Sequence, residues 1–202
     1  MLDKLEKLDL KSPERTAKID FALQRRQPTL TVVLENIHDP HNMNAILRSC
    51  DAVGVMTVHF LYYVEDFPKL NHVTSSGAYK WLEYERHTSV ADCFDKLHAD
   101  GFQILATKLD STAKSLYSCD LTKSTALVLG NEHRGISDEV AALADELIYI
   151  PMMGMAESLN VSVATAVALF EAHRQRTERG MYDTPQLSPE ALRSKRVEWL
   201  MK

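Results

Sequence analysis

The sequence has few cysteines and no long apolar run. Its three cysteines, Cys50, Cys93 and Cys119, are far apart and form no CxxC pair, so neither a zinc motif nor a dithiol redox centre is predicted. An odd number of cysteines is typical of a reducing compartment. No run reaches the about 18 apolar residues of a membrane span, and the charged N-terminus lacks a signal peptide's apolar segment. We therefore expect a soluble cytoplasmic protein that has no membrane partner.

Several common catalytic and phosphate-binding motifs are absent as well. Neither G-x-G-x-x-G nor G-x-x-x-x-G-K-[ST] occurs, which argues against Rossmann and P-loop phosphate sites. There is no G-x-S-x-G, and the pair Cys93 and His98 has no triad context. His38, His41 and His133 could ligate a metal, but an HxxH spacing inside a proline turn is a weak signal. We expect no metal.

Basic residues are not in excess either. The chain has 202 residues, with 23 Lys and Arg against 28 Asp and Glu, a net charge of −5, whereas nucleic-acid binders usually have a basic footprint. The acidity lies in residues 36–170, where nine basic residues face 17 acidic ones. The terminal segments 1–35 and 171–202 carry net charges of +1 and +2. This distribution permits a basic surface formed by the two ends, although the same charges could simply solubilise helices.

Short β-branched runs alternate with amphipathic segments along the chain. The run 30–34 (LTVVL) predicts a buried strand, and Met43, Ile46, Leu47 and Cys50 form the apolar stripe of a helix over 42–52. This alternation predicts an α/β core with a mostly parallel sheet. Further strands are expected at 55–63, 81–86, 102–107, 125–129 and 147–150, and further helices at 90–99, after Ser137, and at 158–179. Helices are also expected within 1–27, with a break at Ser12-Pro13, and at the C-terminus after Pro185 and Pro189.

Three expected strands end in unusual polar segments, where open α/β sheets bind ligands. In the first, Asn42 and Asn44 begin a helix whose free N–H groups face a ligand space, and Arg48 follows as a cation in need of an anionic partner. In the second, Gly130 and Gly135 allow close approach of the backbone. The third, residues 150–163, is rich in methionine. These features could equally be an Asx-rich turn, a structural ion pair of Arg48 and core-filling methionines.

Taken together, the three segments resemble a known family. N-I-H-D-P-H-N-M-N-A-I-L-R, L-G-N-E-H-R-G-I-S and I-P-M-M-G-M-A-E-S-L-N-V-S-V-A are similar, in order, to the three motifs of the SpoU branch of the SPOUT RNA methyltransferases. The strings R-R-Q-P, R-S-C-D-A-V-G-V and E-A-H-R-Q-R resemble one subgroup, the bacterial tRNA guanosine 2′-O-methyltransferases that act on position 18 of the D-loop. The resemblance covers about three quarters of the chain.

The resemblance implies a fold and a cofactor. The fold would be an α/β core whose C-terminal part, about 126–170, forms a deep trefoil knot, flanked by N- and C-terminal helices. The implied division is an N-terminal RNA-binding extension (1–27), a methyltransferase domain (28–182) and a C-terminal helix (183–202). The methyl donor would be S-adenosylmethionine, with no metal, and the enzyme would be a homodimer joined partly by the helix of the third motif. The implied cofactor contacts are Thr107, Leu129, Gly130, Ile150, Met155, Ser158 and Leu159.

The resemblance also implies the reaction, which is methyl transfer to a ribose 2′-hydroxyl of tRNA. Its catalytic residue would be Arg48, and because arginine is a poor base we favour a phosphate and oxyanion clamp for it. Asn42 would orient Arg48 or the ribose, and Glu132, Ser158 and Asn160 would hold the pocket. RNA would be bound by Lys11, Arg15, Lys18, Arg25, Arg26, Arg174 and Arg176. The alternatives are methylation of ribosomal RNA or of another tRNA position, an inactive RNA-binding module on this fold, and a small-molecule nucleotide binder.

Overall fold

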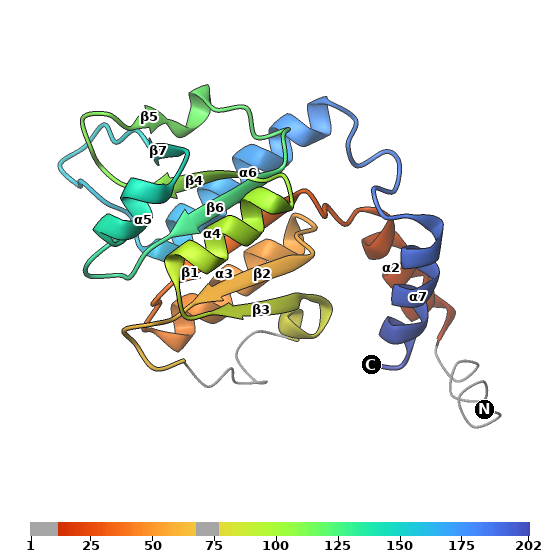
Figure 1. The fold of residues 1–202 in the computed structure, drawn as a ribbon. Helices are drawn as coiled ribbons and strands as arrows, with labels where there is room; N and C mark the ends of the chain where they lie inside the picture. The colour runs from red at the N-terminus through yellow and green to blue at the C-terminus, as the bar shows by residue number, and fades with distance from the viewer. Residues whose placement is uncertain (1–11, 68–76) are drawn as a thin grey trace.

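The core of the protein is one parallel sheet of seven strands (Figure 1). The computed structural model describes residues 12–67 and 77–202. The strand order is β3-β2-β1-β6-β4-β7-β5, and every pairing between these strands is parallel, which confirms the expected sheet. The strands are β1 (Leu30–Glu35), β2 (Thr57–Leu61), β3 (Glu83–His87), β4 (Gln103–Thr107), β5 (Lys114–Ser115), β6 (Thr125–Leu129) and β7 (Glu146–Tyr149). The sequence analysis missed only β5, whose two residues are too short to show a pattern.

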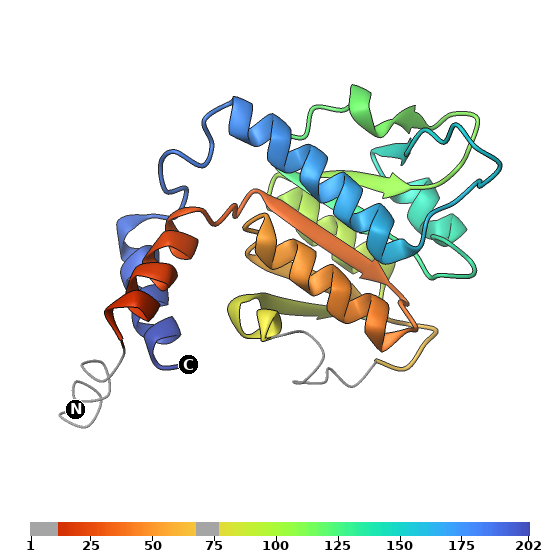
Figure 2. The same ribbon diagram turned by 180° about the vertical axis from the view of Figure 1, so that it is seen from behind.

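Helices cover both faces of this sheet (Figures 1 and 2). The helices α3 (Pro40–Ala52) and α6 (Val161–Glu178) pack on one face, where they bury Val32 and Leu34 of β1. On the opposite face, α4 (Val90–Ala99) and α5 (Asp138–Leu143) pack over Val33. Because side chains of a strand alternate between faces, the run LTVVL fills both layers of the core.

The helix starts explain two differences from the sequence analysis. Asp39 caps α3 by accepting a hydrogen bond from the amide of His41, so this helix begins at Pro40 and Asn42 lies inside its first turn. Asn160 caps α6 through the amide of Ser162, so Ser158 precedes the helix and lies in an irregular segment. Ser12, Ser89, Ser137 and Ser188 cap the other α-helices of the described residues in the same way.

The helices near the two termini, α2 (Pro13–Gln24) and α7 (Pro189–Leu200), pack against each other beside the sheet (Figure 2). Ile19 and Leu23 of α2 bury Trp199 and Leu200 of α7, and the Trp81 ring lies 5.0 Å from that of Trp199. Asp20 and Arg196 form an ion pair across the two helices. The helices α2 and α7 therefore form one helical unit, and the division of the chain into 1–27, 28–182 and 183–202 stays a prediction.

The structure bears on the expected absence of membrane spans and on the cysteines. In the described parts of the chain no helix is long and apolar enough to cross a membrane. The three cysteines are buried and unpaired, in agreement with the absence of a dithiol motif. The knotted path through residues 126–170 stays a prediction.

Candidate functional site

The three polar segments meet at the carboxyl ends of β1, β6 and β7. Leu34 and Leu129 are register partners at the ends of neighbouring strands, which brings the loops after β1 and β6 together. Beside them lies a cavity of about 530 Å³, within the range of small-molecule sites. Six of the seven residues predicted to bind a cofactor line it: Thr107, Leu129, Gly130, Ile150, Ser158 and Leu159. Met155 does not line the cavity, and its side chain is fully exposed; its contact with the cofactor stays a prediction.

The backbone of the second segment folds back on itself beside the cavity. Asn131 and Gly135 form an isolated antiparallel β-bridge. Gly135 has a φ of 68°, a left-handed conformation that glycine adopts without strain. A Cβ atom on Gly130 would lie 2.1 Å from the carbonyl carbon of Gly135. Only glycine fits at position 130, so the loop presents backbone groups to the cavity at close range.

A chain of hydrogen bonds joins all three segments through Glu132, Asn42 and Asn160; we call it the polar chain. The Asn42 amide donates to Glu132 Oε1 at 3.0 Å, and the Asn160 amide donates to Asn42 Oδ1 at 3.0 Å. Glu132 also accepts the backbone N–H groups of His38 and Asp39, at 3.0 and 3.1 Å. Both ends of the Asn42 amide are thereby fixed in orientation. Three of the five predicted catalytic residues come together in this chain, although they lie up to 118 residues apart.

Glu132 is held as a carboxylate. Partial burial opposes its ionisation, but the hydrogen bonds from Asn42 and from the amides of His38 and Asp39 outweigh burial and lower its pKa. The Glu132 carboxylate lies beside the first turn of α3, where the free N–H groups at the start of the helix favour negative charge.

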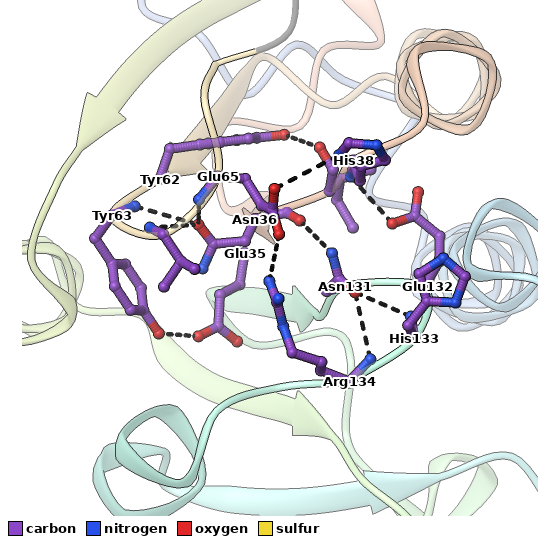
Figure 3. Close-up of polar contacts among 12 residues, drawn as sticks. Glu35, Asn36, His38, Tyr62, Tyr63, Glu65, Asn131, Glu132, His133 and Arg134 are labelled. Carbon is purple, nitrogen blue, oxygen red and sulfur yellow. Dashed lines mark hydrogen bonds and ion pairs between the residues drawn. The ribbon is translucent and has the colours of Figure 1, made fainter.

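Sequence reasoning missed a second polar network next to the polar chain (Figure 3). Asn36 has a φ of 49°, and its Oδ1 accepts the backbone N–H groups of Tyr63, Val64 and Glu65. Asn131 donates to the Asn36 carbonyl at 2.8 Å and accepts from the amide of His133. This network fixes the loops after β1, β2 and β6. An asparagine directly after a buried strand was the signal, because asparagine tolerates the left-handed conformation.

The two other predicted catalytic residues are exposed. Ser158 lines the cavity, and its side chain is open to solvent. Arg48 lies on the exposed face of α3, and its guanidinium forms no ion pair or hydrogen bond with a side chain among residues 12–67 and 77–202. The structural ion pair considered for Arg48 is therefore not found within the described residues. Asn42 is engaged with Glu132 and Asn160, so it does not orient Arg48 here.

Two predicted RNA-binding arginines are buried, which corrects their assignment. Arg176 is 0% exposed, and its guanidinium donates to five protein oxygens: one each on Gln27, Leu121 and Lys123 and two on Thr29. Burial lowers its pKa to about 10. Arg26 is 1% exposed and donates to Asp51 and to the Val55 carbonyl. These guanidinium groups hold the segment before β1 to α6, to α3 and to the start of β2, and their burial keeps them from a phosphate at the surface.

Of the other five predicted RNA-binding residues, four lie at the surface and one falls outside the described part of the chain. Arg15 and Lys18 are exposed on α2. Arg25 is partly exposed and stacks on Phe21, and Arg174 is exposed but paired with Glu171 and Glu178. Lys11 lies outside the described residues. Of the seven basic residues, Arg15 and Lys18 thus have exposed side chains and no ion pair within the described residues.

The chain matches known proteins over most of its length. The model of the SpoU rRNA Methylase family matches residues 29–170. The chain belongs to this family. It is 48% identical to a Thermus thermophilus protein named tRNA (guanosine(18)-2′-O)-methyltransferase, over 93% of this chain and 96% of that protein. The region that matches the family model contains all three segments of the site, and therefore every residue of the polar chain.

Solved structures of the family agree with the fold. An Aquifex aeolicus TrmH/SpoU tRNA modifying enzyme superposes with a TM-score of 0.87 at 40% identity, over 93% of this chain and 95% of the other. The SpoU methyltransferase AviRb of Streptomyces viridochromogenes, solved in complex with the cofactor AdoMet, has a TM-score of 0.66 at 31% identity. That match covers 77% of this chain and 61% of the other. The α/β fold predicted from the sequence is therefore that of SpoU methyltransferases.

Proposed function

We propose that this protein transfers a methyl group from S-adenosylmethionine to the ribose 2′-hydroxyl of guanosine 18 in the tRNA D-loop. The observation that carries the proposal is the near full-length similarity to an enzyme named for this reaction, combined with the polar chain that joins the three segments. A nucleotide binder or an inactive RNA-binding module has no need for a fixed asparagine and carboxylate together with an exposed arginine on the same helix as the asparagine.

The cavity supports the proposed cofactor. It is lined by Leu129, Ile150 and Leu159 and by backbone at Gly130, a mostly apolar wall with close backbone approach that suits an adenine ring and a thioether chain. Thr107 and Ser158 supply hydroxyl groups at the same cavity. When bound, S-adenosylmethionine supplies an electrophilic methyl group on a sulfonium. No group in this wall requires a metal, and we propose that none takes part.

The role proposed for each catalytic residue follows from its contacts. Arg48 is exposed and has no ion pair with another described residue, so it clamps a phosphate of the RNA and stabilises the developing negative charge on the 2′-oxygen. Arginine's pKa of above about 12 makes it a poor proton acceptor. Asn42 and Asn160, fixed by Glu132, hold the ribose in line with the methyl donor, and Ser158 closes the cavity beside them.

The RNA surface and the dimer extend this proposal. Arg15 and Lys18 of α2, with Arg25 and Lys11, contact phosphates away from the reacting ribose. Val163 and Phe170, seven residues apart on one face of α6, are 48% and 52% exposed. Exposed apolar side chains on one face of a helix are typical of an interface, so we propose that α6 joins two copies of the chain. Arg174, exposed on the same helix, contacts RNA once a phosphate replaces its present carboxylate partners.

The experiment that tests the function is methyl transfer from labelled S-adenosylmethionine to total RNA from a host that lacks this activity, followed by nucleoside mapping. We expect label in the tRNA fraction only, as 2′-O-methylguanosine at position 18. Label in ribosomal RNA would support the alternative substrate. Label on a base, or no label in any RNA, would contradict the proposal. Light scattering of the same sample, with Phe170→Glu compared to the unaltered chain, tests the dimer.

A further inference from the structure

Three side chains that suit a metal ion meet on the opposite side of the sheet from α3 and α6. His59 lies on β2, His87 is the last residue of β3, and Cys93 lies in α4. Their ligand atoms, one from each residue, all lie within 4.8 Å of one another, and His59 Nδ1 is 3.0 Å from His87 Nε2. None of the three lines the cavity of the proposed active site. The cluster is therefore separate from the proposed chemistry.

The fold brings these residues together from distant positions. His59 pairs in register with Glu85, two residues before His87, so Glu85 and His87 point to the same face of the edge strand as His59. Ser89 then caps α4, which turns back over that face and buries Cys93 in the core layer beneath it. Because the residues come from two strands and a helix, their spacing matches no sequence motif for metal binding.

Burial favours the neutral form of both imidazoles. The pKa of His59 is lowered to about 4, first by burial and then by the neighbouring His87 and Lys96. Burial also lowers the pKa of His87. A neutral imidazole has a free lone pair on one ring nitrogen, which is the form that binds metals.

We propose that His59, His87 and Cys93 form a binding site for a zinc-class divalent cation, with the Glu85 carboxylate as the fourth ligand. Glu85 Oε2 lies 3.8 Å from His59 Nδ1 and 4.0 Å from His87 Nε2, so its carboxylate faces the two imidazoles. Two nitrogens, one sulfur and one oxygen are a donor set that favours tetrahedral Zn²⁺. Tetrahedral zinc, with ligand bonds of about 2.0–2.3 Å, places its ligand atoms roughly 3.3–3.7 Å apart. When the ion binds, the two imidazole nitrogens therefore move slightly apart, and the Cys93 sulfur and the Glu85 oxygen move inward.

The charges around the cluster also fit a divalent cation. A thiolate at Cys93 and the Glu85 carboxylate together neutralise two positive charges. Lys96 lies 3.6 Å from Glu85, but its ammonium is closer to Asp100, at 2.7 Å, which gives it a partner when Glu85 turns to the metal. Because all four ligands come from the protein, the site is closed and its role is structural. It ties the edge strand β3 to α4.

The test uses the full chain, purified without a histidine tag and stripped with a chelator. Titration with Co²⁺ should give the absorption of tetrahedral coordination and a thiolate-to-metal charge-transfer band that saturate at one ion per chain. Zn²⁺ should displace Co²⁺ and raise the melting temperature. We expect His87→Gln to weaken binding by at least about tenfold. Cys93→Ser should lose the charge-transfer band. His98→Gln is the matched control, because His98 lies on α4 outside the cluster and pairs with Asp145.

Two results would overturn the site. One is a Co²⁺ spectrum of the unaltered protein that shows only octahedral, water-like coordination. The other is a spectrum and affinity that Cys93→Ser and His87→Gln leave unchanged. In either case His59 and His87 are simply a hydrogen-bonded pair. If Cys93→Ser does not fold, the titration of the unaltered chain and of His87→Gln still decides the question.

Discussion

The site at the strand ends holds a carboxylate in place, whereas the region beside the α2–α7 pair holds a guanidinium. At the strand ends, Glu132 is held by donors from the loop after β1 and the start of α3, while Arg48 extends to solvent and has no partner among the described residues. Beside the helix pair, Arg26 is buried and donates to Asp51 and to the Val55 carbonyl, while Arg15 and Lys18 are exposed. An arginine that is buried among protein acceptors is part of the fold, and an exposed arginine is available to a substrate. Variants of the charged residues in the two regions test this distinction.

The largest expected effect is that of Arg48→Ala on catalysis. Removing a charge that stabilises the developing oxyanion should lower single-turnover methyl transfer by at least about 10²-fold to 10³-fold. Cofactor affinity, measured by calorimetric titration, should not change. The free energy of unfolding should change by less than about 0.5 kcal/mol, because the side chain is exposed. Lys123→Ala, an exposed cation at the amino end of β6, is the control. Retained turnover in Arg48→Ala would remove this residue from the chemistry.

The next effect is on stability and concerns Arg176→Ala. Its five hydrogen bonds join α6 to the start of β1 and to residues 121–123, and their loss leaves buried carbonyl groups without donors. We expect the free energy of unfolding to fall by about 3 to 5 kcal/mol, measured by urea denaturation. Arg174→Ala, two residues away and exposed, should cost at most about 1 kcal/mol. A stable Arg176→Ala protein with weakened RNA binding would show that Arg176 contacts RNA and does not stabilise the fold.

A smaller effect is expected from replacing Arg15 and Lys18 together by alanine. Loss of two phosphate contacts should raise the KM for tRNA several-fold and leave kcat unchanged. The slope of log affinity against log salt concentration should fall by about 1.4 to 1.8. Folding should be unaffected, since both side chains are exposed. Glu14→Gln on the same helix is the matched control, and a double variant with an unaltered salt slope would show that RNA lies elsewhere.

The smallest effect is a pH dependence that arises from Glu132. Its folded pKa lies below the ordinary value of 4.5, so its carboxylate stabilises the fold above that pH. This contribution should be lost as pH falls from about 4.5 through the folded pKa. Glu132→Gln should therefore make unfolding less sensitive to acid in that window. Asp95→Asn, an exposed carboxylate on α4, should leave the acid sensitivity as it was.

The convergence of the three polar segments could be predicted from the sequence because it follows from where the parallel strands end. Runs such as LTVVL fix the strands, parallel strands end at the same edge, and Asn42, Glu132 and Asn160 follow strand ends and so converge. The fate of the arginines could not be predicted in this way. Arg174 and Arg176 look alike in sequence, but a separation of two residues places them on nearly opposite sides of α6. Arg174 faces solvent, and Arg176 faces Thr29 and Leu121. Such burial depends on contacts between segments about 150 residues apart.

The measurement that tests the central proposal most directly compares two tRNAs that differ by one oxygen atom. One carries guanosine at position 18 and the other carries 2′-deoxyguanosine there. With labelled S-adenosylmethionine, we expect the first tRNA to accept one methyl group and the second to accept none. Equal labelling of both tRNAs would contradict methyl transfer to the 2′-oxygen of guanosine 18.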